Sequence, residues 1–506
     1  MPPPSPRDRR VLLIASLCCA MTVLETNVVA IVLPAIARDL QADFAQVEWV
    51  VSSYLLCFCS LLLPAGTIAD RYGRRRVLLA GLALFGATSL ACALATTTLA
   101  LCIARASQGI GAAFLLAPAL AIIGHRYHEG AARDRAWAFW GTMMGLTMVL
   151  SPMLGGLVSS LLGWRWAFAA CLPILALLGA GAWRWIEEST DPALRPLDPP
   201  GIASFMLAMF GVVLGLVEGP AAGWTSLPAL AGFTLALTMG GLFVAIELRR
   251  RQPMLDLRLL RQPCFVGALL AMAGYAISAQ VMAAMLPQYL QNGLGLDALH
   301  AGFSMLPFAG AMLLFPHLGR GLGRHLPPWK ILALGLGIAA LGNALTAAGA
   351  WQATPWLAIL GMAVIGAGGG LLNGETPKAI IGAAPRDRAG MASGISATAR
   401  FTGILVGFTV LGGALSTGVR SALARLQDGA TVTLHADGIA TGSIVDPALA
   451  AIARTLYGQG FAVALSLSSI AAFVIAILVA MLMGSRLAEG HTLSGIPEPS
   501  RAQRTG

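Results

Sequence analysis

The stretch "GTIADRYGRRRVLLAG" runs from Gly66 to Gly81 and joins two long apolar runs, residues 47-68 and 77-98. Each run has about the 20 residues that a helix needs to cross a bilayer. Gly73, which lies between the two runs, permits a tight turn. Asp70 comes just before the second run, where a helix N-terminus favours negative charge. The stretch therefore predicts two membrane-spanning helices joined by a short loop that carries several arginines.

The same pattern continues along the whole chain. Hydrophobic residues make up 57% of it and charged residues only 11%, against about 25% charged in soluble proteins. The apolar runs are residues 11-35, 47-68, 77-98, 100-123, 136-160, 165-185, 201-220, 228-248, 264-290, 301-322, 330-350, 355-382, 390-416 and 460-484. We therefore expect an all-α polytopic membrane protein with fourteen transmembrane helices. The first run has the basic start of a signal peptide but no convincing cleavage site, so we expect it to be retained.

The basic residues predict the orientation of these helices. Of the 33 lysines and arginines, 25 fall in segments that fourteen spans place on the same side as the N-terminus. Basic loops stay in the cytoplasm, so we expect both termini to be cytoplasmic, in a bacterial-type inner membrane. Because the basic residues separate apolar runs instead of forming one cluster, they do not indicate binding to nucleic acid.

Two short words recur in the chain and indicate an internal duplication. RDRA begins at Arg133 and again at Arg386, and AIIG begins at Ala121 and again at Ala379. Both copies of RDRA are expected in cytoplasmic loops, eight spans apart. Two six-helix halves separated by two inserted linking helices give this offset, and parallel halves place a substrate site between them. The predicted divisions are 1-190 and 263-485 for the halves, 191-262 for the insert and 486-506 for a cytoplasmic tail.

Several motifs resemble those of one transporter family. Besides the stretch from Gly66, they include "LETNVVAIVLPAI" from Leu24, "RASQGIGAA" from Arg105 and "GLTMVLSPMLGG" from Gly145. In this order they resemble the major facilitator superfamily. The fourteen-span count, "GWRWAF" from Gly163 and "RAGMASGISATAR" narrow the resemblance to its drug:proton antiporters with fourteen helices. The resemblance covers nearly the whole chain.

This resemblance implies roles for two of the motifs. The stretch from Gly66 would latch the two halves together in one state of an alternating-access cycle. The alternative is that its arginines only set the orientation of the helices in the membrane. Its residues are Gly66, Asp70, Arg71, Gly73 and Arg74. The second is an antiporter motif, although small residues also serve helix packing in any membrane protein. Its residues are Gly145, Pro152, Gly155 and Gly156.

Charges inside the spans are informative because each costs on the order of 3 kcal/mol at the bilayer centre. Glu25 lies in the first span, where the family usually has Asp, and Arg105 lies in the fourth. A carboxyl group in an apolar cavity favours its protonated form and ionises when it meets water. We therefore expect Glu25 to couple transport to protons with the help of Arg105. The alternative is a permanent structural partnership of Glu25 with Arg105, or with Asn27 and Gln108.

The predicted substrate cavity draws on residues from both halves. These residues are Asn27, Gln108, Tyr275, Gln280, Glu375 and Lys378. Lys378 is expected to bind an anionic group on the cargo. The alternative is that Lys378 reaches the membrane interface with Glu375 as its neutralising partner. Arg400 is a further charge within a span, to which the sequence assigns no role.

Other chemistry has no support in the sequence. The eight cysteines and seven histidines show no metal-ligand spacing, and we find no phosphate-binding loop. We therefore expect no enzyme activity, metal or cofactor, and a proton gradient as the energy source. The expected partners are a small-molecule substrate, protons and the lipid bilayer, with a monomer as the functional unit.

The leading hypothesis is a proton-coupled exporter of amphiphilic drugs or metabolites that works by alternating access. One alternative is a dedicated carrier for a single organic anion, and another is a membrane sensor that transports nothing. The segment 417-458 is expected to be an outer loop, with "SALARLQ" as a short amphipathic helix on the surface.

Overall fold

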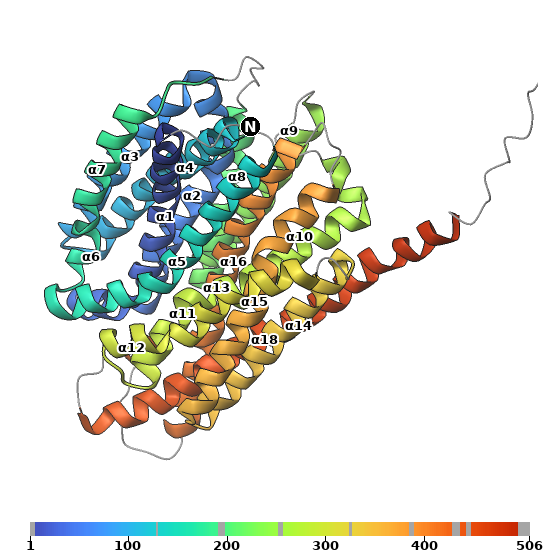
Figure 1. Ribbon diagram of the computed structural model, residues 1–506. Coiled ribbons are helices and arrows are strands. Elements are labelled where there is room, and N and C mark those ends of the chain that lie inside the picture. The colour runs from blue at the N-terminus through green and yellow to red at the C-terminus, as the bar shows by residue number, and fades with distance from the viewer. Residues whose placement is uncertain are drawn as a thin grey trace, which may run out of the picture.

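The computed structural model describes residues 6–127, 130–190, 198–250, 257–322, 326–383, 389–427, 436–441 and 447–493. Within these ranges the chain consists of helices and the turns that join them, with no β-strand (Figure 1). Fourteen of the described segments are helical, long and apolar enough to cross a membrane. The all-α class and the fourteen spans are therefore confirmed.

The first six spans are built from α1 (Pro6–Asp39), α2 (Phe44–Tyr72), α3 (Arg74–Ala93), α4 (Thr98–Arg126), α5 (Gly130–Leu162), α6 (Arg165–Ala169) and α7 (Cys171–Trp185). Asp43 starts α2 with a capping box, since Asp43 Oδ1 accepts from the Gln46 amide at 2.7 Å. Small residues then let the helices approach closely. A Cβ on Gly109 of α4, for example, would overlap the Tyr54 carbonyl oxygen of α2.

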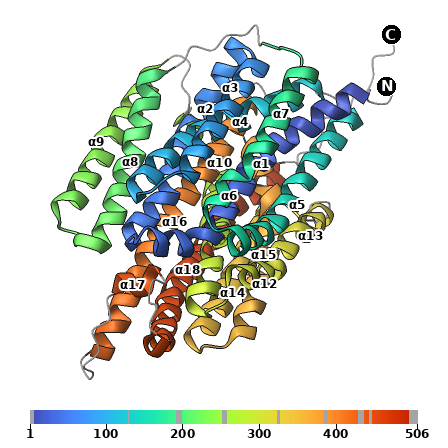
Figure 2. The same cartoon turned by 90° about the vertical axis from the view of Figure 1, so that its left-hand side faces the viewer.

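Two further spans, α8 (Pro199–Ala222) and α9 (Leu227–Arg249), pack against each other at one edge of the bundle (Figure 2). α8 also contacts α2 and α16, which belong to opposite ends of the chain. The predicted boundaries at 190 and 262 fall between helices, but the division into two halves and an insert stays a prediction.

The last six spans contain η1 (Leu257–Arg261) as their lead-in, followed by α10 (Pro263–Tyr275), η2 (Ala276–Gln280), α11 (Met282–Gln288), η3 (Tyr289–Gly293), α12 (Ala298–Ser304), α13 (Leu306–Leu322), α14 (Pro328–Trp351), α15 (Pro355–Ala383), α16 (Ala389–Gln427), α17 (Ala436–Thr441) and α18 (Pro447–Leu493). α10, η2, α11 and η3 form one span, in which η2 and η3 are wide π turns. α14 packs against both α15 and α18.

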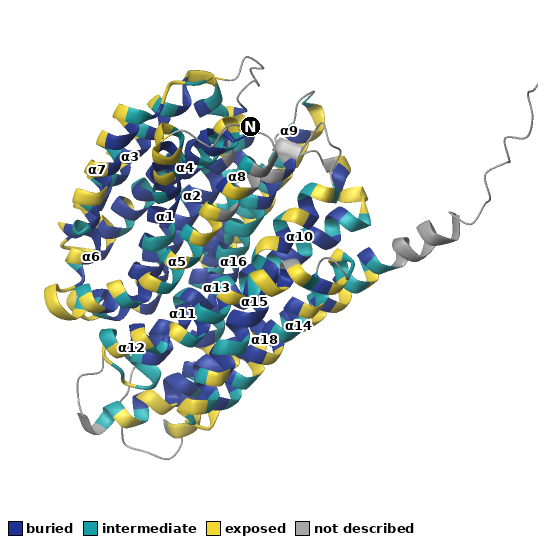
Figure 3. Ribbon diagram, viewed as in Figure 1, coloured by how far each residue is buried: buried dark blue, intermediate teal, exposed yellow. Residues whose placement is uncertain are grey.

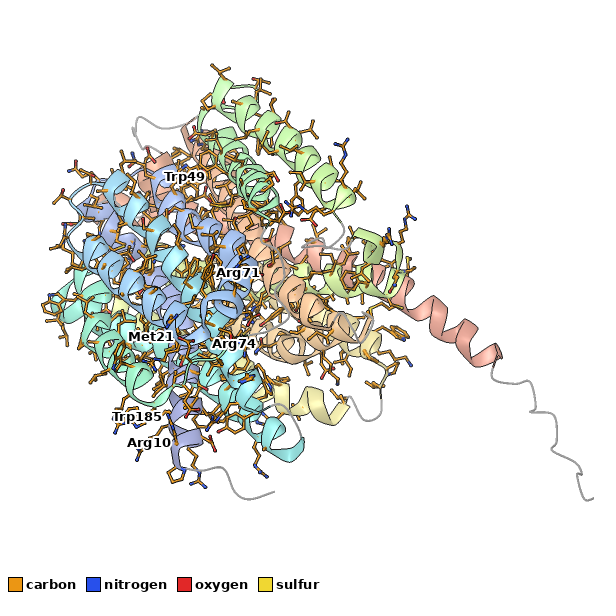
Figure 4. All side chains as sticks on the ribbon, turned by 90° about the horizontal axis from the view of Figure 1, so that it is seen from above. Arg10, Met21, Trp49, Arg71, Arg74 and Trp185 are labelled. Carbon is orange, nitrogen blue, oxygen red and sulfur yellow. The ribbon has the colours of Figure 1, made fainter. Side chains whose placement is uncertain are left out.

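The outer surface suits a lipid environment. Many large apolar side chains are exposed, among them Leu99, Leu177 and Leu237. Exposed positions lie along the outward faces of the helices (Figure 3). At one end of the bundle, Arg10 of α1 lies over the ring of Trp185 at the end of α7, 5.4 Å from its centroid (Figure 4). Cationic and aromatic side chains of this kind mark membrane interfaces.

Two expectations about segment ends were wrong. Ser421 to Gln427, the "SALARLQ" segment, continues α16 as its last turns, and α18 already begins at Pro447. Alanine, leucine and arginine favour helix, so α16 extends beyond its apolar run, and Ala422 and Leu423 pack inside the bundle. The first RDRA copy likewise lies in the first turns of α5 and not in a loop. Residues 386–388 of the second copy lie outside the described residues.

The orientation can be tested with single cysteines in a background without the eight native cysteines. A cysteine at Asp134 or Asp387 should react with a membrane-impermeant maleimide only from the cytoplasmic side. Ser160→Cys, at the exposed opposite end of α5, should react only from the outside. Labelling of Asp134→Cys or Asp387→Cys from the outside would contradict the predicted orientation.

Candidate functional site

A buried ion pair joins the first and fourth spans. Arg105 Nη1 of α4 lies 2.8 Å from Glu25 Oε1 of α1, and the two side chains are 1% and 0% exposed. The sequence paired these residues, and the structure brings them together. A buried pair of this kind is retained only with good geometry and further hydrogen bonds, because removing two charges from water is costly.

The surroundings of Arg105 supply those hydrogen bonds. Its Nη1 also donates to Gln108 Oε1 at 2.7 Å, and its Nε donates to the Val50 carbonyl of α2 at 3.2 Å. Gln108 Nε2 in turn donates to Ser89 Oγ of α3 at 2.8 Å. The guanidinium also lies 4.3 Å from the centroid of the Tyr54 ring, a favourable cation–π distance. Four helices thus hold one neutralised pair.

Asn27 does not belong to this cluster. Its Nδ2 donates to the Val23 carbonyl of the same helix at 2.9 Å. Gln108, which was placed in the substrate cavity, is fully buried beside Arg105. The structure therefore groups Gln108 with the ion pair and leaves Asn27 apart from it.

Removing one partner of this pair should be costly. Glu25→Leu leaves the Arg105 guanidinium buried without its countercharge, so it should lower stability by on the order of 3 kcal/mol. Glu25→Gln keeps an acceptor oxygen for Arg105 and should cost less. Thermal unfolding of the purified variants in detergent measures both. A Glu25→Leu protein as stable as the wild type would contradict the role of this pair in the fold.

A second polar network lies in the C-terminal part of the chain. Tyr275 Oη donates to Asn373 Oδ1 at 3.0 Å, and Gln280 Nε2 donates to Tyr275 Oη at 2.5 Å. Arg400 of α16 donates to Gln280 Oε1 from Nη2 at 2.7 Å and from Nε at 3.2 Å. Tyr275 and Gln280 were expected in the cavity, whereas Asn373 and Arg400 were not assigned to it.

The wide turn η2 explains why Tyr275 and Gln280 meet. In a π turn the hydrogen bonds join residues five apart, and here the Val281 amide donates to the Ala276 carbonyl at 2.9 Å. Side chains five apart can then share one face. Asn343 of α14 also stabilises this turn, because its Nδ2 donates to the Ser278 carbonyl at 2.8 Å.

Glu375 and Lys378 form a local ion pair on α15. Lys378 Nζ lies 3.2 Å from Glu375 Oε2, as their i, i+3 spacing predicts. The Glu375 side chain is buried, whereas that of Lys378 is 64% exposed. This geometry fits the alternative in which Glu375 neutralises an outward-reaching Lys378.

The loop with the possible latch role is held within the first six spans. Asp70 accepts from Arg74 at 2.8 Å. Gly73 joins α2 to α3 with a φ of 108°, which favours glycine. Glu188, just after α7, accepts from the Arg75 amide at 3.0 Å. Gly66 faces Ala117 of α4, and Arg71 lies over the ring of Tyr72. A latch role stays a prediction.

The antiporter motif lies where α5 meets helices from both parts of the chain. A Cβ on Gly155 would lie 3.2 Å from Val28 Cα of α1, and one on Gly156 would overlap the Ala298 carbonyl oxygen at the start of α12. Pro152 presents its carbonyl to Gly302 of α12. Gly145 likewise faces Leu313 of α13. These residues allow α5 to contact α1 on one face and α12 and α13 on another.

Glu48 is a buried carboxylate that the sequence analysis did not single out. It lies in the second turn of α2, is 2% exposed, and its Oε1 has no hydrogen-bond partner among the described residues. It packs against Gly412 of α16, where a Cβ would overlap Glu48 Oε1. It falls inside the apolar run 47-68, and the sequence analysis assigned it no role.

The contact between Glu48 and Gly412 predicts a pair of linked effects. Gly412→Ala should lower stability by on the order of 1 kcal/mol, because the added methyl group displaces the carboxyl end of the buried Glu48 side chain. Glu48→Ala in the same chain should relieve the overlap and recover most of the loss. Gly374→Ala is the matched control, since nothing lies within 4 Å of a Cβ there. Equal unfolding temperatures for Gly412→Ala and Gly374→Ala would contradict the contact.

Comparisons with known proteins agree with this architecture. The family model described as Major Facilitator Superfamily matches residues 15–408. The multidrug resistance protein Stp of Mycobacterium tuberculosis is 33% identical over 80% of this chain and 75% of its own length. The methylenomycin A resistance protein of Streptomyces coelicolor is 32% identical over 78% of this chain and 82% of its own.

Solved structures show the same fold. A bacterial homolog of the human lysosomal transporter Spinster superposes with a TM-score of 0.66 at 17% identity. The match covers 96% of this chain and 98% of that one.

Proposed function

Because this chain belongs to the major facilitator superfamily, and within it to the fourteen-helix drug:proton antiporters, we propose that it exports amphiphilic small molecules across the inner membrane in exchange for protons. The names of its relatives support export, since they refer to multidrug resistance, to methylenomycin A resistance and to a drug efflux pump. The single observation that carries proton coupling is the buried pair of Glu25 and Arg105.

This pair has the properties that a coupling site needs. A proton on Glu25 removes its negative charge and weakens its attraction to Arg105, whereas loss of the proton restores the pair. Arg105 also bonds to the backbone of α2 at Val50. A change in the pair therefore acts on the contact between α1, α2 and α4. The membrane potential supplies about 2.3 kcal/mol per elementary charge at 100 mV to drive such a cycle.

Alternating access also requires surfaces along which the halves can move. In this proposal α5 is one of them, because its small residues let it lie against α1 and against α12 at once. The loop around Asp70 and Arg74 then latches the halves in one of the two states. The protein works as a monomer, without a cofactor, and its partners are its cargo, protons and lipid.

The coupling role of Glu25 can be tested in proteoliposomes. Glu25→Gln keeps the size of the side chain but does not titrate, so cargo-dependent proton flux should fall at least tenfold. Cargo exchange without a pH gradient should persist, because that exchange needs no proton transfer. Ethidium and a panel of neutral and anionic amphiphiles serve as cargo.

Glu218→Gln on α8 is the matched control and should keep the wild-type flux. Glu218 is a carboxylate near the end of a linking span, outside the proposed machinery. Wild-type proton flux in Glu25→Gln would remove Glu25 from the coupling mechanism. No cargo-dependent flux in the wild type with any amphiphile would contradict the proposed function.

A further inference from the structure

Arg400 differs from Arg105 and Lys378 in having no countercharge among the described residues. Arg105 has the Glu25 carboxylate at 2.8 Å and Lys378 has the Glu375 carboxylate at 3.2 Å. Arg400 has no ion pair with any residue in the described part of the chain, and its side chain is only half-buried. A charge in this position usually faces a polar path or a ligand.

Its protein partners hold the guanidinium in place without neutralising it. Nη2 and Nε both donate to the uncharged Gln280 Oε1, at 2.7 and 3.2 Å. No described residue accepts a hydrogen bond from Nη1. Part of the guanidinium therefore remains available to an acceptor that the protein does not itself supply.

The groups behind Gln280 fix its orientation. Gln280 donates to Tyr275 Oη, which donates to Asn373 of α15, so the amide oxygen is left to face Arg400. This arrangement depends on the π turn η2, which Asn343 stabilises through the Ser278 carbonyl. π turns are rare and frequently occur at functional sites. The cation is thus preorganised by elements from three different helices.

Arg400 lies within the thirteenth span, Gly394–Leu426, and beside the first half of the chain. Its neighbour Phe401 packs against Phe58 of α2, with ring centroids 4.4 Å apart. Phe58 is the middle residue of α2, so this contact lies halfway along that helix. The Arg400 guanidinium lies 5.8 Å from the Tyr275 ring centroid and 5.9 Å from that of Phe401. Aromatic surface and a free cationic edge therefore occur together.

We propose that Arg400 binds the anionic group of the transported molecule, so that the preferred cargo of this exporter is an aromatic organic anion. This inference rests on the proposed export function and names the substrate class of its site. A carboxylate or sulfonate supplies the missing countercharge and accepts charge-assisted hydrogen bonds from the guanidinium. The ring of Phe401, which is only half-buried, provides apolar contact for an aromatic cargo. The anion-binding role expected of Lys378 passes to Arg400, because Lys378 already has Glu375 as its partner.

Three naphthyl compounds that differ only in their polar end test this proposal. They are 1-naphthaleneacetate, 2-(1-naphthyl)ethanol and 2-(1-naphthyl)ethylamine, and their binding to the full-length protein in detergent is measured at neutral pH. The wild type should bind the acetate at least tenfold more tightly than the alcohol. Arg400→Gln should weaken binding of the acetate about tenfold or more, the loss expected for a hydrogen bond to a charged group, and change the alcohol and the amine less than threefold.

Two further variants separate charge from geometry. Arg400→Lys keeps the charge but not the planar fork, so it should retain part of the preference for the acetate. Lys330→Gln, which removes a positive charge at the start of α14, should leave all three affinities as in the wild type. Size-exclusion chromatography shows which variants are folded.

Two results would overturn the proposal. One is a wild type that does not prefer the acetate to the alcohol, which decides the question even if Arg400→Gln does not fold. The other is an equal effect of Arg400→Gln on all three compounds, or no effect. These binding measurements are independent of transport, so a protein that binds the acetate through Arg400 but moves no cargo would contradict the export function alone.

Discussion

A bilayer core does not solvate charge, and this constraint governs the placement of the polar residues in this protein. Arg105 is neutralised by Glu25 and surrounded by Gln108, Val50 and Tyr54, all within the first six spans. In this arrangement the two charges neutralise each other. A proton added to Glu25 would remove the negative charge that neutralises Arg105. An unpaired charge is costly in surroundings of low polarity. For the same reason, protonation of one carboxyl group there strongly changes its electrostatic interaction with neighbouring groups.

Arg400 follows the same constraint with a different outcome. It is oriented by Gln280 and Tyr275 but not neutralised by them. In the proposed mechanism the two arginines have different roles. The countercharge of Arg105 is Glu25, which exchanges the proton, whereas the countercharge of Arg400 is the anionic group of the cargo. On α5, the small residues Gly155 and Gly156 allow that helix to contact α1 and α12 closely.

Hydropathy, basic loops and motif order were sufficient to predict the class, the fourteen spans and the Glu25–Arg105 pair. The C-terminal end of α16 was not predictable from hydropathy, because Ala422 and Leu423 continue the helix beyond the apolar run. The start of α18 at Pro447 likewise lies before its apolar run. Tyr275 and Gln280 were expected in the cavity, but the network that joins them to Arg400 and Asn373 was not predicted. It depends on Tyr275 and Gln280 sharing a face, which five-residue spacing does not allow in an α-helix and which the π turn at η2 provides.

Glu48 shows a further limit of sequence reasoning. A carboxylate near the end of an apolar run is expected to reach water, and only the packing of α2 against Gly412 reveals that it is buried. Close contacts of this kind between helices far apart in sequence depend on the full fold. The sequence contains the residues, but their neighbours follow only from the packing.

In the proposed mechanism Glu25 loses a proton when cargo binds and regains one when cargo leaves. Proton release can be followed with a pH-sensitive dye when cargo is added to purified protein in weakly buffered detergent solution. The wild type should release protons in step with the binding curve, whereas Glu25→Gln should release none although it still binds cargo. Equal proton release from both proteins, or none from a wild type that binds cargo, would contradict this mechanism.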